Sequence, residues 1–408
     1  MRLFTNGFET NTLLGSPGFI EFSQNYGQNS IDTSTVRSGT YSMRVNGMTT
    51  ANIAGVRYYF AYTNQTGGHF HRFYFRVATR PTGNNNIFSI QNSSSVAIVK
   101  VILNSSGRLE LWDEDGQVGS DSSVLSLGTW YRVEVHTDAS GSAGAHIVES
   151  RVDGRAFASS HTRSLSTGTA RAFWGGNGDL ESQTTGDWYF DDLAINNTDI
   201  NSFFKSTEQS WCGAGHVINM RPGGETAWKA WTRGGTDSGS NYGQVDELTP
   251  NDDTDYVYSS TLDQYDIYSL TSSGIPANSK IKLLALNYRA HGDSDISAEN
   301  CYFKIYIYGT DNWNWWREVI DVDSGWETNN NGIPRNPQLV VYRDPYESGE
   351  LLPWTVDSLD NAKVGISIST VNTYPIYITT MWLVVEYADE ILPRVNSEVI
   401  GSSDAMIY

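Results

Sequence analysis

Pairs of carboxylates are the first candidates for chemistry, because hydrolysis of a glycosidic bond uses two acids. In retaining enzymes the two carboxyl groups lie about 5–5.5 Å apart, which positions i and i+2 on one face of a strand can provide. The nearest run is Glu110, Asp113, Glu114 and Asp115, but it lacks the spacing Glu-x-Asp-x-x-Glu that places such acids on a strand, and it runs into a turn. The sequence therefore assigns no catalytic residue.

His69 and His71 are the remaining candidates for proton transfer. They are two residues apart, next to Arg72 and Arg76. A polysaccharide lyase needs a base such as histidine and a cation that neutralises the sugar carboxylate. The simpler interpretation is that His69 and His71 lie on an ordinary exposed face of a strand.

An acidic segment is the candidate metal site. Asp246, Glu247, Asp252, Asp253 and Asp255 lie within ten residues of a turn-rich stretch. Crowded carboxylates repel one another, and Ca²⁺, which prefers oxygen ligands, would relieve that repulsion. The alternative is a solvated acidic loop. Calcium is thus the one cofactor that the sequence suggests, and none is required.

A tryptophan cluster is the candidate glycan site. Trp313, Trp315 and Trp316 surround Asn314. In an extended segment Trp313 and Trp315 share one face, where indole rings can stack on sugars while Asn314 bonds their hydroxyls. The alternative is that these rings fill a core.

Composition narrows the function classes. The net charge is −19, with a balance of −3 in residues 1–205 and −16 in residues 206–408. An acidic surface repels phosphate backbones, so nucleic acid is not expected as a partner. No apolar run approaches the length of a membrane span, so membrane insertion is not expected either. The N-terminus reaches Asn6 and Gly7 before an apolar core forms, so we expect no secretory signal.

Alternation of apolar and polar residues indicates strands throughout the chain. Phe73, Phe75 and Val77 share one face of a predicted strand. Two further strands run into Asp115-Gly116 and Asp153-Gly154, dipeptides typical of two-residue hairpin turns. We therefore predict an all-β protein made of two antiparallel β-sandwich domains.

The order of these strands resembles a known fold. The segment Gly128–Val135, the turn at Val152-Asp153-Gly154 and the closing strand through Phe190–Leu193 resemble the concanavalin A-like (laminin G-like) jelly roll. The resemblance implies that the first domain is a jelly roll in which one of two stacked sheets holds sugars. The predicted organisation is a jelly-roll domain at 1–197, a linker at 198–210, a second β-sandwich at 211–388 and a tail at 389–408.

The second domain resembles a module of tailed-bacteriophage structural proteins. The resemblance covers 208–388 and includes Val245–Glu247, Asp252–Tyr256, Asp344-Pro345 and Val364–Ile366. It implies a virion protein of the decoration, head-fibre or tail-tip type, displayed on the particle exterior, made in the host cytoplasm and released by lysis. Its implied partners are other virion proteins, and it is expected to form a homo-oligomer.

Together these observations predict a non-enzymatic virion protein that binds cell-surface or environmental glycans for attachment. The alternative is a phage polysaccharide depolymerase, either a glycanase or a lyase, on the tail. The two differ in one structural feature: a depolymerase requires catalytic groups that converge on a glycan-binding face.

Overall fold

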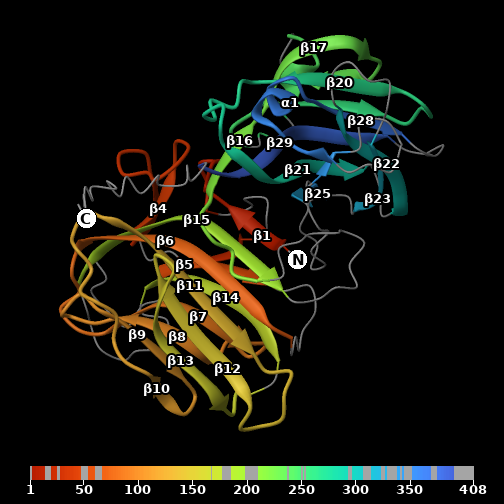
Figure 1. Ribbon diagram of the computed structural model, residues 1–408. Coiled ribbons are helices and arrows are strands. Elements are labelled where there is room, and N and C mark those ends of the chain that lie inside the picture. The colour runs from red at the N-terminus through yellow and green to blue at the C-terminus, as the bar shows by residue number, and fades with distance from the viewer. Residues whose placement is uncertain are drawn as a thin grey trace, which may run out of the picture.

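A computed structural model shows an almost entirely antiparallel β protein built from two sandwiches (Figure 1). This confirms the predicted fold class, including a jelly roll at the N-terminus. The structure describes residues 2–13, 20–24, 28–46, 54–59, 67–166, 168–176, 185–197, 210–236, 239–249, 251, 254–292, 296–306, 314–322, 327–328, 338–340, 342–343, 352–368 and 375–389. Among these, no helix is long and apolar enough to span a bilayer.

The first sheet of the N-terminal sandwich has the order β13-β12-β11-β6-β15-β4-β3, and β1 pairs with β15. Its strands are β1 (Arg2–Asn6), β3 (Asn29–Asp32), β4 (Ser42–Asn46), β6 (His69–Thr79), β11 (Trp130–Asp138), β12 (His146–Val152), β13 (Arg155–Arg163) and β15 (Asp187–Asn197).

The second sheet packs against the first and has the order β10-β9-β8-β7-β14-β5-β2. Its strands are β2 (Ile20–Gln24), β5 (Ala54–Tyr59), β7 (Asn85–Asn92), β8 (Ala97–Leu103), β9 (Leu109–Asp113), β10 (Gly116–Val118) and β14 (Thr169–Gly176). One continuous apolar core, which includes Phe73, Phe88, Trp174 and Phe190, is contributed by strands of both sheets.

The C-terminal sandwich contains a third sheet, β18-β19-β29-β21-β24 with β16 and β25 attached, and a fourth sheet, β17-β20-β28-β22-β23. Its strands are β16 (His216–Met220), β17 (Pro222–Lys229), β18 (Thr232–Gly235), β19 (Asp255–Ser259), β20 (Tyr265–Leu270), β21 (Lys280–Gly292), β22 (Ile296–Tyr306), β23 (Asn314–Val322), β24 (Glu327–Thr328), β25 (Gln338–Val340), β28 (Lys363–Ile368) and β29 (Ile376–Ala388). Beside these lie the strand pair β26 (Tyr342–Arg343) and β27 (Leu352–Pro353), the 3₁₀ turn η1 (Tyr242–Gln244) and the short helix α1 (Val356–Asp360).

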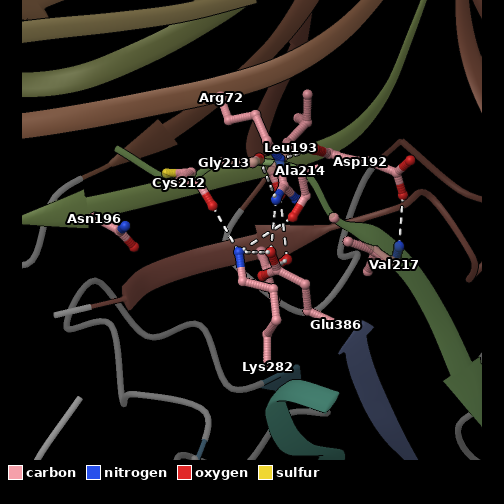
Figure 2. Close-up of polar contacts among 12 residues, drawn as sticks. Arg72, Asp192, Leu193, Asn196, Cys212, Gly213, Ala214, Val217, Lys282 and Glu386 are labelled. Atoms are coloured by element: carbon pink, nitrogen blue, oxygen red, sulfur yellow. Dashed lines mark hydrogen bonds and ion pairs between the residues drawn. The ribbon is translucent and has the colours of Figure 1, made fainter. Parts of the chain in front are cut away.

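Buried charges join the two sandwiches (Figure 2). Arg72 of β6 donates from Nη1 to Oε1 of Glu386 on β29 at 2.6 Å, and both side chains are 0% exposed. Lys282 of β21 lies with Nζ 3.5 Å from the same oxygen and donates to the Cys212 carbonyl at 2.6 Å. A buried ion pair of this kind holds only while both partners are present.

Asp192 provides the second link across the junction. Its backbone adopts a positive φ of 49° at an irregularity in β15. Its Oδ1 accepts from the Val217 amide at 2.6 Å, and its Oδ2 pairs with Arg37. Val217 lies opposite Glu386 in the pairing of β16 with β29, so the end of the first sandwich is bonded directly to the start of the second.

The junction also covers part of the outer face of the first sheet. The Gly215 amide donates to the hydroxyl of Tyr74 at 3.4 Å, and the Cys212 thiol donates to the Phe70 carbonyl at 3.4 Å. The ring of Trp211 lies edge-on to that of Phe70. A ligand therefore cannot occupy the middle of this face while the sandwiches are joined.

Candidate functional site

The outer face of the second sheet carries a row of mainly polar side chains. Residues directly opposite each other in an antiparallel pair point to the same face of the sheet. Arg57 of β5 lies opposite Phe173 of β14, which lies opposite Ser89 of β7. Ser89 lies opposite Lys100 of β8, which lies opposite Trp112 of β9. One residue from each of five strands thus forms a line across the sheet, about 19 Å long at the usual strand spacing.

Flanking positions extend this row on both sides. Arg171 lies opposite Gln91, and Asn86 and Glu110 both lie opposite Ile102. The alternate residues of the same strands belong to the core, as strand geometry requires. We call the following set the polar face: Arg57, Asn86, Ser89, Gln91, Lys100, Glu110, Trp112, Arg171 and Phe173.

Two amides at the centre of the polar face are deeply buried. Asn86 is 0% exposed and Gln91 is 1% exposed. Nε2 of Gln91 donates to Oγ of Ser89 at 3.0 Å. Within the described ranges, Oε1 of Gln91 and both polar atoms of the Asn86 amide have no hydrogen-bond partner. Burying such groups without partners is costly. Arg57, Ser89, Glu110 and Phe173 are also 9% exposed or less, so most of the polar face is covered in this structure.

Glu110 fixes an aromatic ring at one end of the row. Its Oε2 accepts from Nε1 of Trp112 at 2.8 Å, and its Oε1 accepts from Nδ2 of Asn104 at 2.8 Å. Both carboxylate oxygens are therefore already engaged. The bond to Nε1 holds the half-buried indole beside Lys100, where it can stack against the apolar side of a sugar ring.

The charges of the polar face are opposite to those of the whole chain. Arg57, Lys100 and Arg171 contribute three positive charges and Glu110 one negative charge, in a protein of net charge −19. A local concentration of cations on an acidic molecule selects anionic ligands through its field. Guanidinium groups also match the geometry of carboxylates.

His69 and His71, the sequence candidates for a lyase base, do not reach this face. They lie on the same side of β6 as Phe73 and Phe75 and are 1% and 0% exposed. Burial lowers the pKa of His69 to about 4 and that of His71 well below its usual range. The idea that these imidazoles line a groove is wrong, because they share the inward side with the core phenylalanines.

The acids considered for glycosidic cleavage are dispersed in the structure. Asp113 forms an ion pair with Arg163, and its Oδ1 accepts from the Asp115 amide at 2.9 Å. Asp187 pairs with Arg44 at 2.7 Å on the first sheet. Glu110 belongs to the polar face, and Asp121 lies beside it, since Nδ2 of Asn104 donates to Oε1 of Glu110 at 2.8 Å and to Oδ2 of Asp121 at 3.5 Å.

The predicted glycan-binding tryptophans cannot be placed in full. Asn314, Trp315 and Trp316 lie in β23, an edge strand of the fourth sheet, and their side chains lie outside the described part of the chain. Trp313 lies outside the described residues altogether. The glycan site at Trp313, Asn314, Trp315 and Trp316 therefore stays a prediction.

The predicted calcium site is described only in part, since Asp252 and Asp253 lie outside the described residues. Burial, together with the charges of Asp255 and Asp246, raises the pKa of Glu247 to about 9. At neutral pH Glu247 therefore holds a proton, and this proton reduces the repulsion between the carboxylates that Ca²⁺ was expected to reduce. No group of three or more metal-binding side chains occurs among the described residues, and calcium stays a prediction for the whole set.

The first sheet bears a separate cluster that sequence reasoning missed. Oε2 of Glu149 contacts Nδ1 of His136 at 3.1 Å, and its Oε1 contacts Nε2 of His161 at 2.9 Å. The ring of His136 stacks on Phe70, with centroids 4.0 Å apart. The three polar residues come from neighbouring strands, so only the register of β11, β12 and β13 brings them together.

Comparison with known proteins places the fold but no family. No family model and no curated protein sequence matches the chain. Among solved structures, the cellulose induced protein Cip1 is similar at 17% identity and a TM-score of 0.37, over 51% of this chain and 99% of its own. Alginate lyase AlgAT5 from Polysaccharide Lyase family 7 is similar at 13% identity and a TM-score of 0.34, over 46% and 89%. A Trypanosoma rangeli sialidase follows at 10% identity and a TM-score of 0.33, over 47% and 30%.

These neighbours correct one expectation from the sequence. Alginate lyases and sialidases are enzymes, so the expectation that this chain is not an enzyme is contradicted and is dropped. At these identities and TM-scores the likeness assigns no activity to this chain. The comparisons support an all-β fold of the jelly-roll and β-sandwich kind and do not extend to a virion role.

Proposed function

We propose that the polar face of the second sheet binds an acidic polysaccharide and that the chain cleaves it, as a depolymerase does. The observation that carries this proposal is that Arg57, Lys100 and Arg171 share one face of the sheet with the buried amides of Asn86 and Gln91.

The charges of the polar face suit one requirement of an elimination. Hydrolysis requires two carboxyl groups, about 5–5.5 Å apart in retaining enzymes and about 6.5–9.5 Å apart in inverting ones. Asp121 lies beside Glu110, but the oxygens of both acids already accept hydrogen bonds from Asn104, Trp112 or Gln117. Elimination instead breaks the C–H bond next to the uronate carboxylate and the C–O bond of the linkage: a base takes the proton, an acid gives a proton to the leaving oxygen, and the carboxylate must be neutralised. The polar face contains neither histidine nor tyrosine, so its own role is the neutralisation. Cations and amide donors of the polar face supply the neutralisation.

The roles of individual residues follow from their positions. Gln91 lies in β7, the middle strand of the row, and its amide would bond the carboxylate of the sugar at the cleaved linkage. Asn86 lies five residues away on the same strand, about 16 Å at the usual rise, and would bond a different sugar. Arg57 and Arg171 flank them and would hold the carboxylates of neighbouring sugars. Trp112, next to Lys100, would stack on a sugar farther along the chain. Binding energy spread along the polymer in this way can be used to orient the reacting sugar.

The test is a depolymerisation assay on the full chain with alginate, pectate and hyaluronan, and with dextran as a neutral polymer. An elimination produces an unsaturated uronate, which is followed by its ultraviolet absorbance, and the loss of viscosity reports cleavage of the polymer. We expect product from at least one acidic polymer and none from dextran.

Matched variants connect the activity to the polar face. Lys100→Ala removes a half-buried cation of the row, whereas Arg155→Ala removes an exposed cation of β13 on the other sheet. Losing one charge-assisted contact should weaken binding of the acidic polymer by roughly tenfold in Lys100→Ala and leave Arg155→Ala unchanged. Equal loss in both variants, or no binding and no cleavage of any acidic polymer, would refute the proposal.

We also propose display on the exterior of a phage particle, in keeping with the depolymerase alternative. The resemblance of 208–388 to a phage structural module supports this location. Immunogold labelling of purified particles with antibody to residues 1–205 tests it. Gold at the tail end agrees with a depolymerase, gold over the capsid would point to decoration, and no gold on intact particles would remove the virion role.

A further inference from the structure

Trp228 stands out on the surface of the C-terminal sandwich. The large apolar side chains that are more than a third exposed in the described residues are Val96, Val124, Leu127, Trp228 and Leu262. Trp228 is the only aromatic one among them, and it is 55% exposed. Leaving an indole in water forfeits the free energy that burying it would provide, and its neighbours decide whether this ring is part of a binding surface.

The backbone around Trp228 is anchored on both sides. Its amide donates to Oγ1 of Thr226 at 3.1 Å, and Lys229 pairs with Glu225 at 2.7 Å. Three residues farther on, Trp231 is buried, and its amide donates to Oδ1 of Asp266 at 2.8 Å. The exposed indole therefore stands on a fixed segment of β17 instead of a loose loop.

Tyr265 turns this single ring into an aromatic platform. It lies in β20, next to β17 in the fourth sheet, with its ring centroid 6.2 Å from that of Trp228 and the planes at 74°. Beside this ring the indole remains 55% exposed. The Tyr265 hydroxyl lies 3.5 Å from Oδ1 of exposed Asp263, so polar groups border the apolar surface. An apolar ring face beside hydroxyl and carboxyl groups suits a pyranose, which has an apolar side and a rim of hydroxyls.

Charge decides which kind of sugar this platform accepts. Residues 206–408 contain 12 basic and 28 acidic side chains. At the platform itself Lys229 offsets Glu225, and exposed Asp263 borders Tyr265. A polyanion would be repelled there, whereas an uncharged chain would not. We propose that Trp228 and Tyr265 form a second glycan-binding site, selective for neutral pyranose polymers and independent of the polar face.

The experiment is affinity electrophoresis of the full chain in native gels that contain hydroxyethyl cellulose or dextran. Wild-type protein should be retarded by at least one of these neutral polymers. Trp228→Ala should weaken this binding by roughly threefold to tenfold, as expected for one aromatic contact. Leu127→Ala removes an equally exposed apolar side chain from the N-terminal sandwich and should have no effect. Equal melting temperatures of the variants would show that both remain folded.

Several results would overturn this inference. The site does not exist as proposed if neither neutral polymer retards the wild type, or if Trp228→Ala migrates like the wild type. If sedimentation shows that the wild type self-associates and Trp228→Ala does not, the platform is a contact between copies of the chain. Lys100→Ala should keep its binding to neutral polymer, so failure of the polar face and failure of the platform are distinguished.

Discussion

The buried ion pair at the junction gives the sharpest prediction. Replacing Glu386 by Gln removes the anion that Arg72 contacts at 2.6 Å and Lys282 at 3.5 Å, while both members of the Arg72–Glu386 pair are 0% exposed. Burial acts to lower the pKa of Arg72, but the surrounding charges, that of Glu386 first, outweigh it and raise this pKa above its ordinary value. Glu386→Gln removes the first of these charges, but a guanidinium keeps its proton throughout the ordinary pH range, so Arg72 would stay charged without its partner.

The expected cost follows from leaving a charge buried without its partner. Breaking a buried pair by removing one member costs about 3–5 kcal/mol. Replacing both members by apolar residues of similar size, Arg72→Met with Glu386→Leu, should restore most of the stability. The exposed pair of Lys229 and Glu225 serves as the control, because removing it should cost no more than about 1 kcal/mol.

Urea unfolding followed by tryptophan fluorescence measures these differences. Because the chain has two sandwiches, its unfolding is fitted with two transitions. Glu386→Gln should lower the urea midpoint of the transition in which the C-terminal sandwich unfolds. A Glu386→Gln change within about 0.5 kcal/mol of the wild type, the range of ordinary surface substitutions, would refute the reasoning. So would a double apolar variant less stable than the single one.

Three further predictions concern two buried titratable groups and one glycine with a positive φ. The pKa of His69 falls from 6.5 to about 4 on folding, so the unfolded state binds more protons in this window. The stability that neutral His69 contributes is complete above pH 6.5 and decreases by roughly 3 kcal/mol as the pH falls towards 4. Urea unfolding of the wild type and of His69→Gln at several pH values measures this contribution as a difference in unfolding free energy. A difference that does not change with pH would contradict the prediction. If the acidic set around Glu247 binds calcium, calcium should raise the melting temperature, most strongly above pH 9, where Glu247 has lost its proton. An equal rise in the melting temperature of Glu247→Gln would exclude this residue as a ligand. Gly235 has a positive φ of 87°, and an added Cβ would lie 2.1 Å from the Thr254 carbonyl oxygen. Gly235→Ala should therefore lower the free energy of unfolding by more than about 1 kcal/mol. A lower urea midpoint would measure this loss.

Local sequence predicted the strands and several turns. The alternation from His71 to Val77 lies within β6. Asp153 and Gly154 have positive φ values of 49° and 82°, as the predicted hairpin between β12 and β13 requires. At Asp115-Gly116 the hairpin also exists, but Gly116 pairs with Asp113, so its two turn residues are Glu114 and Asp115. Such features depend on neighbours in the chain, which is why they can be read without a structure.

The inward side of β6 was also open to prediction. His69 and His71 have the same parity as Phe73 and Phe75, so alternation already places them with the core residues. Treating them as groove residues overlooked this parity and gave weight to the neighbouring arginines. The structure assigns Arg72 to the opposite side, where it meets Glu386 and not a ligand.

Only the tertiary structure assembled the polar face. Arg57, Gln91 and Lys100 come from three strands, and Arg171 from a fourth that lies far along the chain but next to β7 in the sheet. Their meeting depends on pairing register, and a shift of one residue would send each of these side chains into the core. By itself the sequence determined an all-β chain of alternating strands and an acidic C-terminal half. Long-range pairing and packing, which local pattern does not encode, decided which polar residues share a surface and which charges are buried at the junction.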